Sequence, residues 1–141
     1  MARHKEQKLY DRFKDRATGR LLFYRIENLM MNGMSDMIVQ NKKGVTAWVE
    51  NKAIEAWPVR ANTVALRNAF QRGQLSFLRE WIGWNGHAYV LLRVGQGVKA
   101  QYLLLNPLEP LDLLSRNQLE TRAAVVQGME EIVSFLEGIA A

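Results

Sequence analysis

The sequence has no cysteine and only two histidines, His4 and His87, among its 141 residues. The absence of cysteine excludes disulfide scaffolds, thiol nucleophiles and zinc fingers. Two histidines are also too few for a histidine-rich metal centre or for an enzyme motif that needs several imidazoles. Any metal in this protein would therefore be bound by oxygen ligands, which favours Mg²⁺-like ions over Zn²⁺.

Long apolar runs are also absent. No stretch approaches the roughly 20 apolar residues of a membrane-spanning helix, and the N-terminal sequence MARHKEQK lacks the apolar core of a signal peptide. We therefore expect a soluble protein of the cytoplasm with no membrane partner. Hydrophobic residues make up 48% of the chain, which is enough for a core, and the length predicts one domain.

Charge is distributed unevenly along the chain. Residues 1–99 carry 17 Lys and Arg against 8 Asp and Glu, whereas residues 100–141 carry 2 against 6. A basic face is typical of proteins that bind a phosphate backbone, although an ordinary solvated surface explains the charge alone equally well. The candidate nucleic-acid contacts are Arg25, Lys42, Lys43, Arg60, Arg67, Arg72 and the loop tryptophan Trp57.

Hydrophobic periodicity predicts a helix, three strands, a helix, a strand and then a C-terminal extension. The expected elements are a helix at 4–17, strands at 20–27, 34–40 and 45–52, a helix at 73–84, a buried strand at 87–94, an edge strand at 102–105 and one amphipathic acidic helix at 115–138. The connection 53–71 is expected to be mostly irregular, with room for a short helix at 63–69. This order indicates one α/β domain with a core at 1–99 and an extension at 100–141.

The turn at 42–44 sets the register of the two strands around it. A three-residue turn with its glycine in the left-handed conformation pairs Asn41 with Val45. Counting outward from this pair places Asp36 opposite Glu50. Directly opposed residues on one face of a sheet have their Cβ atoms about 4.5–5.5 Å apart, so two carboxylates would face each other.

Lys52 completes this group, because side chains alternate faces along a strand and Lys52 is two residues beyond Glu50. Opposed carboxylates destabilise a sheet unless a cation offsets them. The pattern therefore indicates a divalent-ion site. Alternatively, a slip of one residue turns Asp36 away and leaves Glu50 and Lys52 as a plain surface ion pair.

These residues also resemble a known family. Gly33-Met-Ser-Asp36 followed by Glu50-Asn-Lys52 looks like the signature of the PD-(D/E)xK nucleases, and more narrowly of the VRR-NUC and Holliday-junction-resolvase-like nucleases common in phages. The resemblance runs from about residue 24 to residue 94 and includes Arg25-Ile-Glu-Asn28, Trp48-Val-Glu-Asn-Lys52, Trp57-Pro58 and a helix-opening Gln74. Ser35 stands where the family usually has proline, a residue that shapes the backbone and binds no metal.

The resemblance implies a restriction-endonuclease-like α/β fold, with a mixed sheet flanked by helices and a C-terminal helical extension. It further implies that Asp36 and Glu50 bind Mg²⁺, for which Mn²⁺ would substitute, with the backbone carbonyl of Asn51 as a further ligand. Lys52 would orient the attacking water or stabilise developing charge. Gln74 would steady the water or the substrate, the alternative being a helix-start glutamine that faces solvent.

One more acidic ligand is expected from the N-terminal region, as in related nucleases. Glu27 is the better candidate because it closes the strand just before the motif. Glu6 lies among Arg3, Lys5 and Lys8, where an ion pair on the helix surface is the expected role.

The function implied is that of a Mg²⁺-dependent DNA endonuclease, first of all one that resolves Holliday junctions or other branched DNA in phage recombination or replication, in the cytoplasm of the host cell. A homodimer is expected, because symmetric cutting needs two sites related by a two-fold axis, and the helix at 115–138 would either contribute to it or pack on its own subunit. The alternatives are a less structure-selective nuclease acting on flaps or nicked DNA, a non-catalytic DNA-binding protein on the same fold, and a structural phage protein with a chance motif.

Overall fold

The computed structural model describes residues 2–26 and 36–140, with the backbone alone described at residues 2–5 and 127. Its elements, in chain order, are α1 (Ala2–Ala17), β1 (Leu22–Arg25), β2 (Met37–Gln40), β3 (Thr46–Ile54), α2 (Gln74–Gly83), β4 (His87–Val94), the 3₁₀ turn η1 (Gly97–Lys99), β5 (Gln101–Leu105), the 3₁₀ turn η2 (Leu111–Leu113), α3 (Arg116–Arg122), β6 (Val125–Gln127) and α4 (Met129–Gly138). The order of the first six elements is the one that the sequence predicts.

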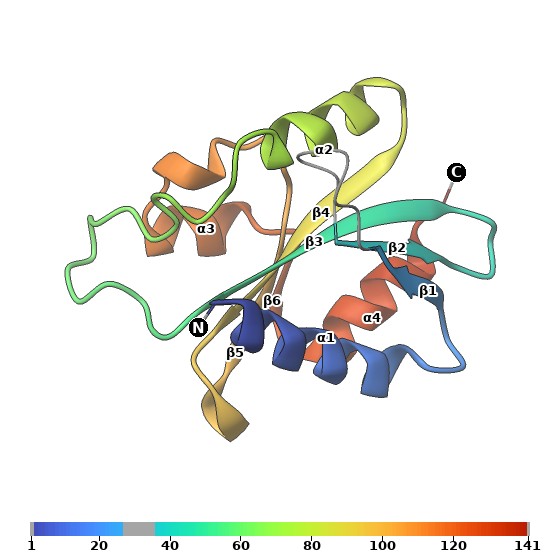
Figure 1. Ribbon diagram of the computed structural model, residues 1–141, viewed down its shortest axis with the longest axis horizontal. Coiled ribbons are helices and arrows are strands. Elements are labelled where there is room, and N and C mark those ends of the chain that lie inside the picture. The colour runs from blue at the N-terminus through green and yellow to red at the C-terminus, as the bar shows by residue number, and fades with distance from the viewer. Residues whose placement is uncertain (1, 27–35, 141) are drawn as a thin grey trace.

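The described strands form one mixed sheet with helices on both faces. The six strands lie in sequence order from β1 to β6. The β3–β4 pair is parallel and is connected through α2, whereas the other neighbouring pairs are antiparallel. Figure 1 shows α1 and α4 covering one face of the sheet and α2 and α3 lying over the other. None of the helices in this part of the chain is long and apolar enough to cross a membrane.

Each face of the sheet carries its own apolar core. Leu9 and Phe13, four residues apart on α1, are fully buried against the first face, because residues at this spacing share one side of a helix. Leu78 of α2 is buried against the second face. Burying each of these side chains stabilises the fold by about 1.5–3 kcal/mol. Strand β4 contributes to both cores through Leu91 and Leu92, which explains its unbroken apolar sequence.

The β2–β3 hairpin has the predicted register. Met37 pairs with Val49, and the backbone N–H of Asn41 donates to the carbonyl of Val45 at 3.0 Å. Gly44 has a φ of 80°, the left-handed conformation that this turn requires and that glycine adopts without steric cost. The alternative of a one-residue slip is therefore wrong.

The C-terminal region differs from the expectation of one long helix at 115–138. The chain forms α3, then β6, then α4, so that β6 pairs with β5 and makes β5 an inner strand instead of the expected edge strand. Leu119 of α3 packs on one face of the sheet and Ile132 of α4 on the other. The apolar period continues through both halves, but the chain crosses the edge of the sheet between them.

The connection between β3 and α2 contains no helix at 63–69. Val64 forms an isolated bridge with Ser115, which extends the backbone there. Asn68 has a φ of 65°, a left-handed conformation that a right-handed helix does not contain. Leu66, between them, is 1% exposed and anchors the connection in the core.

The apolar side of α4 is buried within its own chain. Met129, Ile132 and Val133 pack on the face of the sheet that α1 also covers. Arg20 fixes the outer side of α4 through ion pairs of 2.8 Å to Glu130 and 2.6 Å to Glu137. These large apolar residues of α4 thus pack within the core of their own chain.

Candidate active site

Asp36, Glu50 and Lys52 lie together where β2 begins beside the middle of β3. Extending the β2–β3 register by one residue beyond Met37 and Val49 places Asp36 opposite Glu50. Glu50 is 1% exposed and Lys52 is 6% exposed. The Nζ atom of Lys52 lies 3.5 Å from Oε2 of Glu50. These two residues form a buried pair, so the alternative of a plain surface ion pair is wrong.

Asp36 is fixed by the backbone of the neighbouring strand. Its Oδ2 atom accepts a hydrogen bond of 3.1 Å from the backbone N–H of Asn51. Asn51 is itself buried, and its side-chain oxygen has no hydrogen-bond partner in the described part of the chain. The peptide of Asn51 therefore lies beside the Asp36 carboxylate, and the use of its backbone carbonyl as a ligand stays a prediction.

Gln74 connects this group to α2. Its Nε2 atom donates to Oε2 of Glu50 at 3.1 Å, and its Oε1 atom accepts from the backbone N–H of Gln71 at 2.9 Å. Gln74 is buried, so the alternative of a glutamine facing solvent is wrong. The amide orients the Glu50 carboxylate, whereas a contact with water or substrate stays a prediction.

The environment of Glu50 strongly favours its neutral form when no cation is present. Burial, then the negative charge of Asp36, raise the pKa of Glu50 to about 9, and Lys52 only partly opposes this. Its Oε1 atom is buried without a hydrogen-bond partner among the described residues. An unpaired buried oxygen of this kind is costly unless a cation or water reaches it.

Glu6 lies closer to this group than the sequence suggests. Burial raises the pKa of Glu6, and the charges of Lys52, Asp36 and Arg25 also act on it. The side chains of Arg3 and Lys5 lie outside the described residues, so the expected ion pair on the helix surface stays a prediction. Glu27, the preferred extra ligand, lies outside the described residues. The signal for Glu6 was its position on the apolar side of α1, three residues before Leu9.

The donor set fits a hard cation. Asp36 and Glu50 supply carboxylate oxygens, and one of them is buried without a partner. Within the described ranges no three Asp, Glu or His side chains converge closely enough to hold a metal ion by themselves. Mg²⁺ commonly binds through one or two carboxylates and keeps several waters, so two carboxylates suffice for it and would not suffice for a closed structural zinc site.

Among the predicted nucleic-acid contacts, Arg25 lies beside the start of β2, because it pairs with Met37, the residue after Asp36. It ends β1, donates a hydrogen bond to the side chain of Gln7 and lies 5.3 Å from the centre of the Tyr10 ring. Arg25 is exposed. It therefore presents a cation at the end of the sheet where Glu6 and Asp36 lie.

The other predicted basic contacts fall into two groups. Arg60, Arg67 and Arg72 are exposed along the connection that leads to Gln74. Lys42 and Lys43 lie in the turn at the opposite end of the β2–β3 hairpin, where Nζ of Lys43 donates to the carbonyl of Gly138 at 3.3 Å. The two lysines are therefore separated from Asp36 by the length of β2, whereas Arg72 lies two residues before Gln74.

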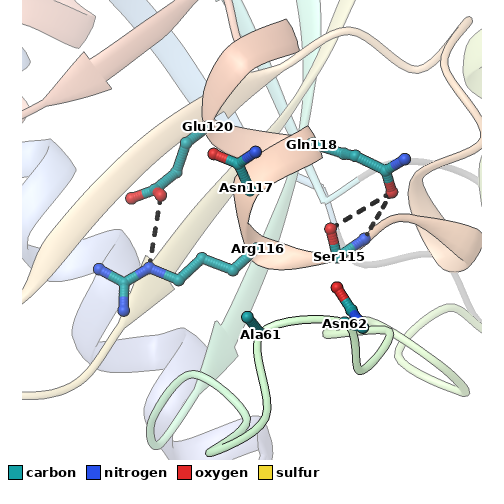
Figure 2. Close-up of a pocket in the computed structure, with 7 residues that line it drawn as sticks. All are labelled: Ala61, Asn62, Ser115, Arg116, Asn117, Gln118 and Glu120. Atoms are coloured by element: carbon teal, nitrogen blue, oxygen red, sulfur yellow. Dashed lines mark hydrogen bonds and ion pairs between the residues drawn. The ribbon is translucent and has the colours of Figure 1, made fainter.

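Trp57 lies beside a hollow of about 670 Å³ between the loop at 61–62 and the start of α3. Figure 2 shows the polar side chains that line it: Asn62, Ser115, Arg116, Asn117, Gln118 and Glu120. The Arg116 guanidinium covers one face of the Trp57 ring at 5.1 Å, and Nε1 of Trp57 donates to Gln101 at 2.9 Å. Base stacking on that face would require Arg116 to move.

A comparison with solved structures finds the same fold in an archaeal protein. The chain superimposes on Hjc, a Holliday junction resolvase from Archaeoglobus fulgidus, with a TM-score of 0.58, at 12% sequence identity and over 92% of this chain and 98% of that chain. No protein-family model matches the chain, and no curated protein matches its sequence. The similarity confirms the expected mixed α/β fold with helices on both faces of the sheet.

Proposed function

We propose that this protein is a metal-dependent DNA endonuclease. The observation that carries the proposal is the buried group formed by Asp36, Glu50 and Lys52, in which a lysine ammonium lies 3.5 Å from a carboxylate of raised pKa. Strongly perturbed carboxylates in a group of this kind are more typical of functional sites than of structural ones. The spacing of these residues matches the nuclease signature that the sequence resembles.

Asp36 and Glu50 would hold Mg²⁺, or Mn²⁺ in its place, with Glu6 or Glu27 as a further carboxylate. Such an ion, when bound, would polarise a scissile phosphate and lower the pKa of a bound water, so that hydroxide would be available as the nucleophile near neutral pH. Lys52 donates hydrogen bonds from its ammonium, so it can orient the attacking water or offset negative charge that develops on the phosphate. Gln74 holds the Glu50 carboxylate in place through its amide N–H.

The proposed substrate is branched DNA, with a four-way junction first. The fold similarity to an archaeal Holliday junction resolvase supports this choice, and the exposed arginines of the 53–73 connection supply charge for a phosphate backbone. We propose a homodimer, because two cuts placed symmetrically in a junction need two active sites. Phage recombination or replication is the setting that the sequence resemblance implies.

The direct test is a cleavage assay on four DNA substrates of matched sequence: a labelled four-way junction, a flap, a duplex and a single strand. Each is incubated with wild-type protein and with Asp36→Asn, in Mg²⁺, in Mn²⁺ and in chelator. We expect metal-dependent nicks placed symmetrically in the junction arms, and none with the variant. Equal cutting of all substrates would support the proposed nuclease activity but contradict the proposed preference for junctions. Binding without cutting in any metal would favour a non-catalytic DNA-binding protein.

A further inference from the structure

The segment of residues 64–73, called the strap below, passes over the side of β3 that carries Lys52. It leads directly into α2 and carries Phe70. The centre of the Phe70 ring lies 5.5 Å from Nζ of Lys52, within the range at which an ammonium is attracted to the face of an aromatic ring. No motif in the sequence singles out this phenylalanine.

The strap is held at both ends. At its start, the backbone N–H of Ala65 donates to the carbonyl of Leu114 at 3.2 Å, next to the bridge between Val64 and Ser115. Leu66 is fully buried in the core below α2 and α3. The C-terminal region therefore fixes the beginning of a segment that ends at the active site.

Two backbone conformations then set the position of Phe70. Asn68 has a φ of 65° and Gly73 a φ of 88°, so the chain turns on either side of the phenylalanine. Between these turns, the N–H of Gln71 donates to Gln74, the residue that also contacts Glu50. The strap thus contacts the catalytic group at two points: the ring on Lys52 and the backbone on Gln74.

Lys52 has few alternatives to this position. It is 6% exposed, and the contacts described for its ammonium are the Glu50 carboxylate and the Phe70 ring. A lysine side chain has several rotatable bonds and loses much rotamer freedom when it is fixed. An apolar ring beside the ammonium restricts that freedom without adding a second negative charge that would draw the ammonium away from Glu50.

We infer that Phe70 is a positioning residue, which holds the Lys52 ammonium beside the Glu50 carboxylate through its ring. The inference deepens the proposed function and rests on it for the catalytic consequence. It makes the strap part of the active site. It also gives Leu114 and Ser115, which anchor the strap, a role in positioning the catalytic lysine.

The test compares Phe70→Leu and Phe70→Tyr with Phe77→Leu as the matched control. Phe77 is an aromatic residue of α2 that contacts Trp48, with ring centres 5.3 Å apart. The first readout needs no activity: the NMR signals of the Lys52 ε-methylene group in protein with ¹³C-labelled lysine, assigned through Lys52→Arg. A ring beside the ammonium shifts these signals upfield. We expect the shift in wild type, Phe70→Tyr and Phe77→Leu, and its loss in Phe70→Leu.

The second readout is junction cleavage. We expect Phe70→Leu to lower kcat roughly tenfold with KM unchanged, Phe70→Tyr to restore kcat, and Phe77→Leu to retain it. An unchanged Lys52 signal in Phe70→Leu would overturn the inference, as would a loss of kcat that Phe70→Tyr fails to restore. An inactive wild-type protein with the Lys52 signal shifted as expected would reject the proposed function but retain the contact between Phe70 and Lys52.

Discussion

Gln74 donates a hydrogen bond of 3.1 Å from Nε2 to Oε2 of Glu50. The first residue of α2 is therefore fixed to the central carboxylate of β3, two elements that are connected by a long loop. Because Oε1 of the same amide accepts a hydrogen bond from the backbone N–H of Gln71, both polar atoms of the amide are hydrogen-bonded. A helix-start glutamine thus fixes the position of an acidic residue that lies on the sheet.

Replacing this amide tests its positioning role. We expect Gln74→Ala to lower the free energy of unfolding by about 1–3 kcal/mol, because it removes a hydrogen bond to the buried Glu50 carboxylate and the acceptor of the Gln71 backbone N–H. We also expect it to lower the single-turnover cleavage rate by roughly tenfold or more. Gln71→Ala is the control, since only the backbone of Gln71 contacts Gln74. Cleavage by Gln74→Ala at the wild-type rate would contradict the role.

The raised pKa of Glu50 predicts a specific dependence of stability on pH in the absence of metal. A carboxyl whose pKa is about 9 in the folded state and ordinary in the unfolded state keeps its proton only while folded. Stability should therefore fall as pH rises from about 4.5 to 9, with a slope of at most about 1.4 kcal/mol per pH unit from this group.

Urea denaturation in chelator, measured across pH 6 to 9, checks this slope. Glu50→Gln should flatten it and should be more stable than wild type at the alkaline end, because the neutral amide retains an acceptor for Gln74 and removes the buried charge. Glu80→Gln, an exposed carboxylate on α2, should leave the slope unchanged. Identical slopes for wild type and Glu50→Gln would show that Glu50 titrates normally.

Much of the acidic group could be predicted from the sequence, because it depends on local geometry. The turn ending at Gly44 fixes the hairpin register, and that register alone brings Asp36 opposite Glu50. The position of Glu6 could not be predicted in this way. Its distance from Asp36 depends on how α1 packs on the sheet, which side-chain periodicity does not specify.

The C-terminal region shows a second limit of the sequence pattern. The apolar residues from Leu119 to Leu136 keep a helical period, although β6 lies between α3 and α4. Hydrophobic periodicity indicates which residues are buried. It does not indicate which face of the sheet those residues pack against. The two β-branched residues Val125 and Val126 were the local sign of a strand, and Gly128 was the local sign that a helix starts after it.

Glu6 and Glu27 are the two candidates for the further acidic ligand, and metal titration separates them. Calorimetry with Mn²⁺ should show weaker binding by Glu6→Gln than by wild type, since Glu6 lies near Asp36 and Lys52. Asp15→Asn, an exposed carboxylate further along α1, is the control and should bind as wild type does. Unchanged binding by Glu6→Gln together with weaker binding by Glu27→Gln would return the role to Glu27.

The two groups of basic residues should differ in their effect on DNA binding. Arg67→Ala and Arg72→Ala should each lower junction affinity and reduce the slope of log affinity against log salt by about one, because both arginines are exposed on the connection that leads to Gln74. The double variant Lys42→Ala and Lys43→Ala should have a smaller effect, because this turn lies at the far end of the hairpin, beside α4. A larger effect of the lysine pair would place the DNA on the other end of the sheet.

The central claim is that the buried group on β2 and β3 carries out the chemistry. Single-turnover cleavage of a four-way junction in Mg²⁺, with protein in excess, tests it for wild type, Lys52→Ala and the exposed control Lys99→Ala. We predict that all three proteins bind the junction. The single-turnover cleavage rate of Lys52→Ala should be about 100-fold or more below that of wild type, whereas Lys99→Ala should cleave at the wild-type rate. Cleavage by Lys52→Ala at the wild-type rate would contradict the claim and place the chemistry elsewhere.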